Sequence, residues 1–288
     1  MTAVALALPS VAEDIPDRLF TTQGVELRAD EDVFVLFAAL NAAGYAEETK
    51  RKGPPLRAPV FHPIRRTVRD ALRKFGSRPS VVAMTTLFED HAEELEDYLA
   101  AALGAGGLSP AAQRLQRKLA PALERFRKDA KVVQLFDDLA AEQRAHAQRL
   151  RAGLDRDLSE AAKQLGDDAF RAPKNLVVVP NPLEAHALIR RVQTQNEVLL
   201  ITGPDDQTAR QAVLEAALKP ALRRAVDKHY RSARLFARSW ASLKTNRRIA
   251  RRYIDGRNYL AEALARALAF RVIARREGRA GKDADEAF

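Results

Sequence analysis

The chain has 288 residues, of which 48 are Lys or Arg and 38 are Asp or Glu, giving a formal net charge of +10 and a pI near 10.0. Hydrophobic residues make up 47% and charged residues 30%, which excludes a disordered or low-complexity chain. The absence of Cys excludes disulfide scaffolds, Cys-ligated metal sites and thiol nucleophiles. Aromatic residues are only 6%, and helix-favouring Ala and Leu supply much of the apolar content. The composition therefore predicts a mainly helical globular protein.

Five helices are predicted in the first 165 residues, from the spacing of apolar positions and from the residues that end each segment. They cover residues 30–44, 63–75, 81–103, 109–129 and 131–165. The first begins with acidic residues, which suit a helix N-terminus, and stops at Gly44. A basic, Pro-rich loop separates it from the second.

After Lys174 the pattern becomes strand-like. Three short runs, 175–180, 186–193 and 197–202, are β-branched or alternating. Because the connections between them are short, we expect an antiparallel meander. A long helix then begins near Asp205 and runs toward Trp240, and a last helix covers about 258–276.

The predicted fold class is mainly α with a small antiparallel sheet, an α+β arrangement. We expect a mostly helical region over residues 1–170, followed by a small β-meander with long helices over 171–288. A single continuous domain is the alternative.

The basic excess is concentrated in two segments. Residues 1–50 have 3 basic and 9 acidic side chains, residues 51–80 have 9 and 1, and residues 222–279 have 17 and 4. Clustered Lys and Arg are typical of proteins that bind nucleic acids or other polyanions. We therefore single out Arg247, Arg248, Arg251 and Arg252 as candidate polyanion-binding residues. The alternative interpretation is a solvated helix face.

No stretch approaches the roughly 18 apolar residues that a membrane span requires, so we expect a chain without a transmembrane segment. The N-terminal sequence MTAVALALPSVAED contains a short apolar run but no preceding Lys or Arg. A cytoplasmic protein is therefore expected, with export as the alternative.

The five His residues are isolated, since none has another His three or four positions away. No helix-borne metal site is visible in this spacing, and no phosphate-loop, dinucleotide-binding or nucleophile-elbow motif is present. We predict no metal and no cofactor.

Two later segments carry a family resemblance. The strands are followed by a helix containing Leu214-Glu-Ala-Ala-Leu218 and by a later helix containing Glu262-Ala-Leu-Ala-Arg-Ala267. This order resembles the gluzincin zinc peptidases, most closely an uncharacterised bacterial family of predicted HExxH peptidases. The elements Gly24-Val-Glu-Leu27 and Asn41-Ala-Ala-Gly-Tyr45 are similar to that family's opening. The resemblance implies a zincin-like strand–helix–helix part.

The departure from the family motif bears on the function. In that family the two histidines of HExxH bind zinc, its Glu is the general base, and a downstream Glu is the third ligand. Here Leu214 and Leu218 occupy the histidine positions, whereas Glu215 and Glu262 remain at the positions of the base and third ligand. Because leucine has no lone pair for a metal, the resemblance implies a protein without peptidase activity. Alternatively, these are ordinary core helices in which Glu262 and Arg266 form an i,i+4 ion pair.

Three functional hypotheses follow. The first is a non-catalytic, inactive-metallopeptidase-like protein that binds or scaffolds an unidentified protein partner. The second is a basic nucleic-acid-associated protein that uses segments 51–80 and 222–279. The third is a helical subunit of a larger protein assembly, in which basic faces meet acidic partners.

Overall fold

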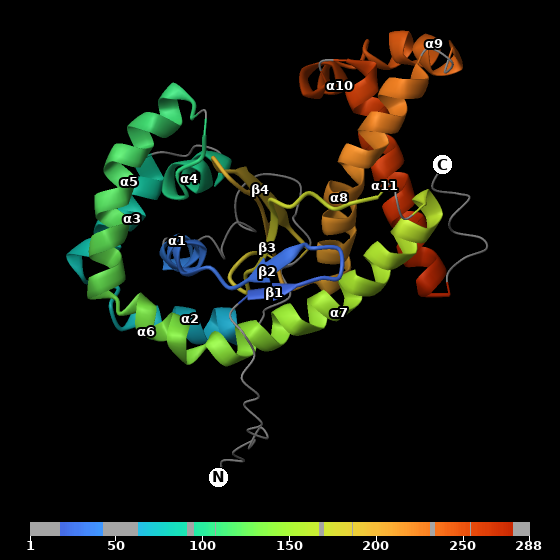
Figure 1. Cartoon of the computed structure of the whole chain (residues 1–288). Coiled ribbons are helices and arrows are strands. Elements are labelled where there is room, and N and C mark those ends of the chain that lie inside the picture. Colours follow the sequence, from blue (N-terminus) through green and yellow to red (C-terminus); the bar gives the residue numbers. More distant parts are fainter. Residues whose placement is uncertain are drawn as a thin grey trace.

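A computed structural model describes residues 18–42, 63–90, 95–106, 108–166, 170–185, 187–230, 234–253 and 255–278 (Figure 1). Its helices are α1 (Glu31–Ala42), α2 (Pro63–Arg73), α3 (Pro79–Asp90), α4 (Leu95–Ala102), α5 (Pro110–Asp129), α6 (Val132–Asp138), α7 (Ala140–Leu165), α8 (Asp206–His229), α9 (Arg234–Leu243), α10 (Arg247–Arg252) and α11 (Gly256–Arg276). Its strands are β1 (Arg18–Phe20), β2 (Glu26–Arg28), β3 (Leu176–Pro180), β4 (Ile189–Gln193) and β5 (Val198–Thr202). The predicted class, mainly α with a small sheet, is confirmed.

The predicted antiparallel meander is wrong, because the sheet is mixed. Its strand order is β1-β2-β3-β5-β4, in which β3 pairs in parallel with both β2 and β5, and only the β1–β2 and β4–β5 pairs are antiparallel. Every residue of β3 and β5 is buried, whereas β4 is largely half-buried or exposed. Strands that are buried on both faces take central positions, so the more polar β4 lies at the edge. Because β4 pairs with one edge of β5, the other edge of β5 pairs with β3.

The first two strands were not predicted. Each has three residues, too few to show the period-two alternation that indicates a strand. Gly24 has a φ of +80° in the turn between them, a conformation that favours glycine. Leu27 of β2 pairs with Val178 of β3, so the sheet draws strands from both 1–170 and 171–288.

Several predicted helices differ in extent. The helix expected over 81–103 corresponds to α3 and α4, and the one expected over 131–165 corresponds to α6 and α7, which meet at the buried Leu139. The long helix expected to run toward Trp240 ends at His229, and α9 follows as a separate helix. The predicted stop at Gly44 and the basic loop before Pro63 lie outside the described residues.

The two faces of the sheet contribute to two different hydrophobic clusters. Val177 and Val179 of β3 pack with the cluster that includes α1, α3 and α5, whereas Leu176 and Val178 pack with α7, α8 and α11. This alternation follows from the strand geometry, in which successive side chains point to opposite faces. Figure 1 shows α1–α6 gathered on one side of the sheet and α8 and α11 on the other.

Buried polar contacts join the helices of the second cluster. The carboxylate of Asp157 on α7 accepts from Arg210 Nε of α8 at 2.6 Å and from Arg276 Nη1 of α11 at 2.6 Å. His146 Nε2 of α7 lies 2.8 Å from Asp206 Oδ1 at the start of α8. The hydrogen bond to His146 holds the pKa of Asp206 below its usual value. Three helices are therefore tied together by side-chain pairs as well as by apolar packing.

Candidate functional site

The two leucines at the histidine positions of the resembled motif lie in the hydrophobic core. Leu214 and Leu218 have no exposed surface and belong to the same cluster as Ala265 and Ala269 of α11. Their i,i+4 spacing puts both on the side of α8 that packs inward. Apolar side chains therefore occupy the space beside this part of α8.

The two glutamates of the resembled motif lie close together at a partly exposed side of α8 and α11. Glu215 Oε1 accepts from Gln211, while its Oε2 lies 3.7 Å from Arg266 Nε. Arg266 Nη2 also lies 3.7 Å from Glu262 Oε1, so this guanidinium stands between the two carboxylates. Glu262 Oε2 additionally accepts from Lys219 Nζ at 2.9 Å. The structure thus brings Glu215 and Glu262 together around cations, apart from the core position of the leucines. Within the described ranges, no group of three His, Cys, Asp or Glu side chains is arranged to hold a metal ion.

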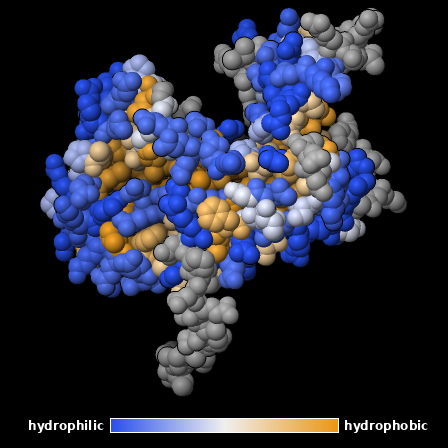
Figure 2. All heavy atoms as spheres, viewed as in Figure 1, coloured by the Kyte–Doolittle hydropathy of each residue, from blue (hydrophilic) through white to orange (hydrophobic). Residues whose placement is uncertain are grey.

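The most distinctive charged feature is an arm that extends from the end of α8 and the start of α11. We call residues 223–257 the basic arm; α9 and α10 lie at its outer end, beside the ends of α8 and α11 and away from the sheet and α1–α7 (Figure 1). This segment contains 12 Lys or Arg and 2 Asp, a formal charge of +10, which equals the net charge of the whole chain. Figure 2 shows mostly hydrophilic surface over the described part of the arm.

Both acidic residues of the basic arm are engaged at its base. Asp227 lies 3.0 Å from Arg223 Nε and 3.7 Å from Arg257 Nη1. Asp255 caps α11 by accepting from the amide of Asn258 at 2.8 Å, and its other oxygen lies 3.9 Å from Arg223 Nη2. The carboxylates therefore neutralise cations near the base of the arm.

Other cations of the basic arm remain open to solvent. Besides Arg257, which pairs with Asp227, the exposed Lys and Arg residues of the arm whose side chains are described are Arg224, Lys228, Lys244 and Arg247. None of these four has a carboxylate partner among the residues that the structure describes. Exposed, unpaired cations on one projecting segment create a positive potential that attracts polyanions.

Aromatic contacts hold the elements of the basic arm against α11. The rings of Trp240 on α9 and Tyr259 on α11 lie 5.5 Å apart, and Tyr253 meets Tyr259 edge-on at 5.1 Å. Arg257 lies over the ring of Tyr230 at 5.0 Å. Gly256 is buried at this junction, where an added Cβ would lie 2.8 Å from both Trp240 Cγ and the Tyr230 hydroxyl. The arm is therefore a packed unit.

The four predicted polyanion-binding arginines all lie on α10, at the outer part of the basic arm. Arg247 is exposed, whereas the side chains of Arg248, Arg251 and Arg252 lie outside the described set. In the other predicted basic segment, 51–80, residues 51–62 are not described and α2 lies at the opposite end of the molecule (Figure 1). The described part of 51–80 and the basic arm therefore lie at different ends of the molecule.

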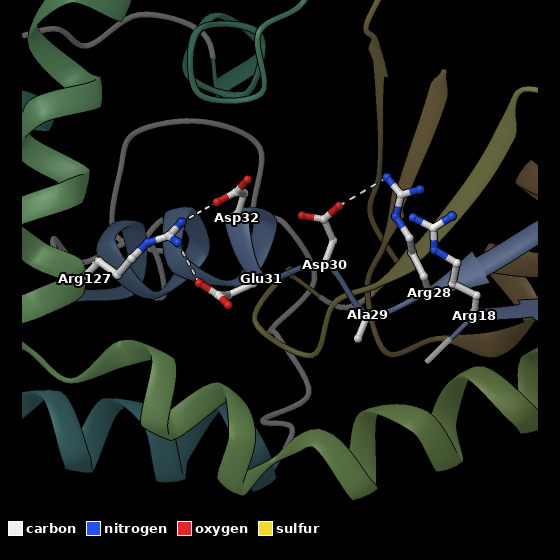
Figure 3. Close-up of a pocket in the computed structure, with 7 residues that line it drawn as sticks. All are labelled: Arg18, Arg28, Ala29, Asp30, Glu31, Asp32 and Arg127. Atoms are coloured by element: carbon white, nitrogen blue, oxygen red, sulfur yellow. Dashed lines mark hydrogen bonds and ion pairs between the residues drawn. The ribbon is translucent and has the colours of Figure 1, made fainter. Parts of the chain in front are cut away.

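A second charged site, a cavity of about 440 Å³, lies between the start of α1, β1, β2 and α5 (Figure 3). Its lining consists of Ala29 and six charged residues: Arg18, Arg28, Arg127, Asp30, Glu31 and Asp32. Three cations face three carboxylates, and Arg127 pairs with both Glu31 and Asp32. The sequence indicated the acidic start of α1, but nothing in it placed these arginines nearby.

Arg28 is the most strongly paired cation in this cavity. Its guanidinium donates to both oxygens of Glu197 at 3.0 and 2.8 Å and lies 3.2 Å from Glu26. The paired hydrogen bonds with Glu197 raise the pKa of Arg28 and lower the pKa of Glu197. Because these charges are already matched within the protein, this cavity offers less to a charged ligand than the basic arm does.

No family model, no curated protein and no solved structure matches the chain. Every helix within the described ranges is too short or too polar to cross a lipid bilayer. A function is therefore inferred from two features of the structure: the basic arm, and the pair of carboxylates formed by Glu215 of α8 and Glu262 of α11.

Proposed function

We propose that the protein is a non-enzymatic nucleic-acid-binding protein and that the basic arm, residues 223–257, is its binding surface. The observation that carries this proposal is the location of the charge: a projecting segment holds +10, as much as the entire chain. The rest of the chain is electrically balanced overall, so it adds no net attraction for a polyanion. The arm supplies the long-range attraction and the phosphate contacts.

The internal pairing of the arm supports the same proposal. Asp227 and Asp255 are held by Arg223 and Arg257 at the base, and within the described part of the chain Arg224, Lys228, Lys244 and Arg247 have no carboxylate partner. Counterions condensed on phosphates are released when such cations bind, and this release drives association. Affinity should therefore depend on the charge of the arm and fall steeply with salt.

Fluorescence anisotropy with a labelled 20-base-pair DNA duplex tests the proposal on the full chain. Wild type should bind at 50 mM salt, and its affinity should fall by at least about tenfold at 200 mM, as expected for several phosphate contacts. Reversal of the α10 cluster, Arg247→Glu, Arg248→Glu, Arg251→Glu and Arg252→Glu, should reduce the affinity by more than about tenfold and lower the salt slope.

A matched control changes the same amount of charge elsewhere. Arg66, Arg114, Arg117 and Arg125 are exposed on α2 and α5, and their reversal to Glu also lowers the net charge by 8. This variant should bind more tightly than the α10 variant. Absence of wild-type binding at 50 mM salt, or equal losses in both quadruple variants, would contradict a binding surface on the arm.

A second candidate is an inactive-metallopeptidase-like scaffold, favoured by the surroundings of the motif residues. Leu214 and Leu218 belong to a buried apolar cluster, Glu215 contacts Arg266, and Glu262 contacts Arg266 and Lys219. The carboxylate of Glu215, at the position of the general base, is already engaged by Gln211 and Arg266 within the protein. In this proposal the peptidase architecture is retained for binding a protein partner.

Metal analysis of the purified protein, together with a peptide-library cleavage assay, tests the second candidate. The expected result is less than stoichiometric zinc and no cleavage above the background of a Glu215→Gln, Glu262→Gln variant. Stoichiometric zinc accompanied by cleavage that the variant lacks would refute it.

A further inference from the structure

Glu262 lies where the basic arm joins the body of the protein. Its Oε1 accepts from the hydroxyl of Tyr253 at 2.6 Å, and its Oε2 accepts from Lys219 Nζ at 2.9 Å. Tyr253 directly follows α10, Lys219 is on α8, and Glu262 is on α11. The carboxylate of Glu262 therefore connects the end of α10 to both α8 and α11 at the base of the arm.

Tyr253 extends this connection to the outer part of the arm. Its ring meets Tyr259 edge-on, and Tyr259 in turn packs against Trp240 of α9. Gly256 lets Trp240 approach α11, because no Cβ fills the space between them. A continuous set of contacts thus runs from Glu262 through three aromatic rings to α9.

We propose that Glu262 is a positioning residue that fixes the orientation of the basic arm and thereby sets its affinity for nucleic acid. This inference rests on the proposed function of the arm. Several cations meet successive phosphates only if the helices that hold them keep a fixed direction, since each misplaced cation loses its contact and its counterion release. Hydrogen bonds to an ionised acceptor are among the stronger ones, so Tyr253 and Lys219 are held firmly.

The sign of the effect separates positioning from simple electrostatics. Glu262→Gln removes a negative charge near the arm, so electrostatics alone predicts tighter binding of DNA. Loss of positioning predicts weaker binding. Tyr253→Phe removes only the hydroxyl, changes no charge, and interrupts the same hydrogen bond.

Duplex anisotropy titrations of the full chain at several salt concentrations test this inference. Glu262→Gln and Tyr253→Phe should each weaken binding by about threefold to tenfold and lower the salt slope, because fewer phosphates are contacted. Glu215→Gln is the matched control: it also removes one negative charge, but Glu215 contacts Gln211 and Arg266 instead of Tyr253. Its affinity should equal or exceed that of wild type.

Thermal unfolding of each variant separates positioning from general loss of fold. If Glu262→Gln is unfolded, Tyr253→Phe decides the matter, since it deletes a single oxygen. Wild-type affinity or tighter binding in a folded Tyr253→Phe variant overturns the inference but leaves the proposed function intact. Failure of the wild type to bind DNA removes the proposed function itself, and the positioning role with it.

Discussion

Asp157 accepts from Arg210 along one edge of the guanidinium, with Nε at 2.6 Å and Nη2 at 3.0 Å, and the pair is buried between α7 and α8. Arg276 of α11 binds the same carboxylate. Gly153 makes room for the arrangement, since a Cβ there would lie 2.7 Å from Arg210 Cδ. Two arginines thus converge on one fully buried carboxylate.

Asp157→Ala should therefore be strongly destabilising. It leaves Arg210 buried without its main partner, and breaking a buried ion pair in this way costs about 3–5 kcal/mol. The denaturant midpoint of the full chain measures the loss. Glu124→Gln, which removes an exposed i,i+4 pair with Lys128, should change stability by less than about 1 kcal/mol. Similar midpoints for the two variants would contradict the role assigned to the buried cluster.

Gly256→Ala should destabilise the junction of the basic arm. The new methyl group would lie 2.8 Å from Trp240 Cγ, so the ring or the helix must shift, at a cost of about 1–3 kcal/mol. Trp240 is the sole tryptophan of the chain, so its fluorescence reports the change directly. Gly106→Ala serves as the control, because nothing lies within 4 Å of a Cβ at that position. An unchanged emission spectrum and midpoint in Gly256→Ala would refute the tight contact.

Leu214→Ala should destabilise the fold by about 2–5 kcal/mol, as expected for truncating a fully buried leucine. Leu264→Ala on α11 should have an effect within about 0.5 kcal/mol, because Leu264 is 41% exposed. Denaturant unfolding of both variants measures the difference. A small effect at Leu214 would show that the helix is not packed there as described.

The His146–Asp206 pair should contribute to acid sensitivity. Because the hydrogen bond to His146 lowers the folded-state pKa of Asp206, the stabilisation is present above the unfolded-state pKa, about 3.9. It is lost as pH falls through the lower, folded-state pKa. Arg149 of α7 and Arg210 of α8 lower the pKa of Asp206 in the same direction.

Urea midpoints measured from about pH 5 to about pH 2 test this contribution. Asp206→Asn should be less stable than wild type at the upper end of this range, and the difference should shrink toward the lower end. Glu124→Gln provides a parallel series for an exposed carboxylate. A difference between Asp206→Asn and wild type that stays constant with pH would contradict the linkage.

The sequence predicted which helices and strands form better than it predicted how the strands pair. Residues 176–180 and 198–201 are continuously apolar, which indicated β3 and β5 correctly. Their parallel pairing depends on the position of β4 at the edge and on β2, a three-residue strand without a local signal. Pairing between distant segments is decided by tertiary packing, which local periodicity does not encode.

The candidate site was predictable in charge but not in shape. The excess of Lys and Arg over 222–279 is visible by counting, and the Glu262–Arg266 pair follows from i,i+4 spacing. The arm itself depends on α8 ending at His229 instead of continuing toward Trp240. The hydrogen bond between Tyr253, just after α10, and Glu262 of α11 joins residues nine positions apart, a spacing that no helical period predicts.

The parallel pairing of β2 with β3 also sets an order of events during synthesis. Leu27 leaves the ribosome long before its neighbour Val178, with the whole of α1–α7 made in between. Until β3 arrives, β2 has an open edge and the apolar face of α1 lacks its cover from β3 and β5. Long-range pairings of this kind form slowly and leave strand edges exposed to other chains. A nascent chain that stops after α7 is therefore the species most in need of a chaperone.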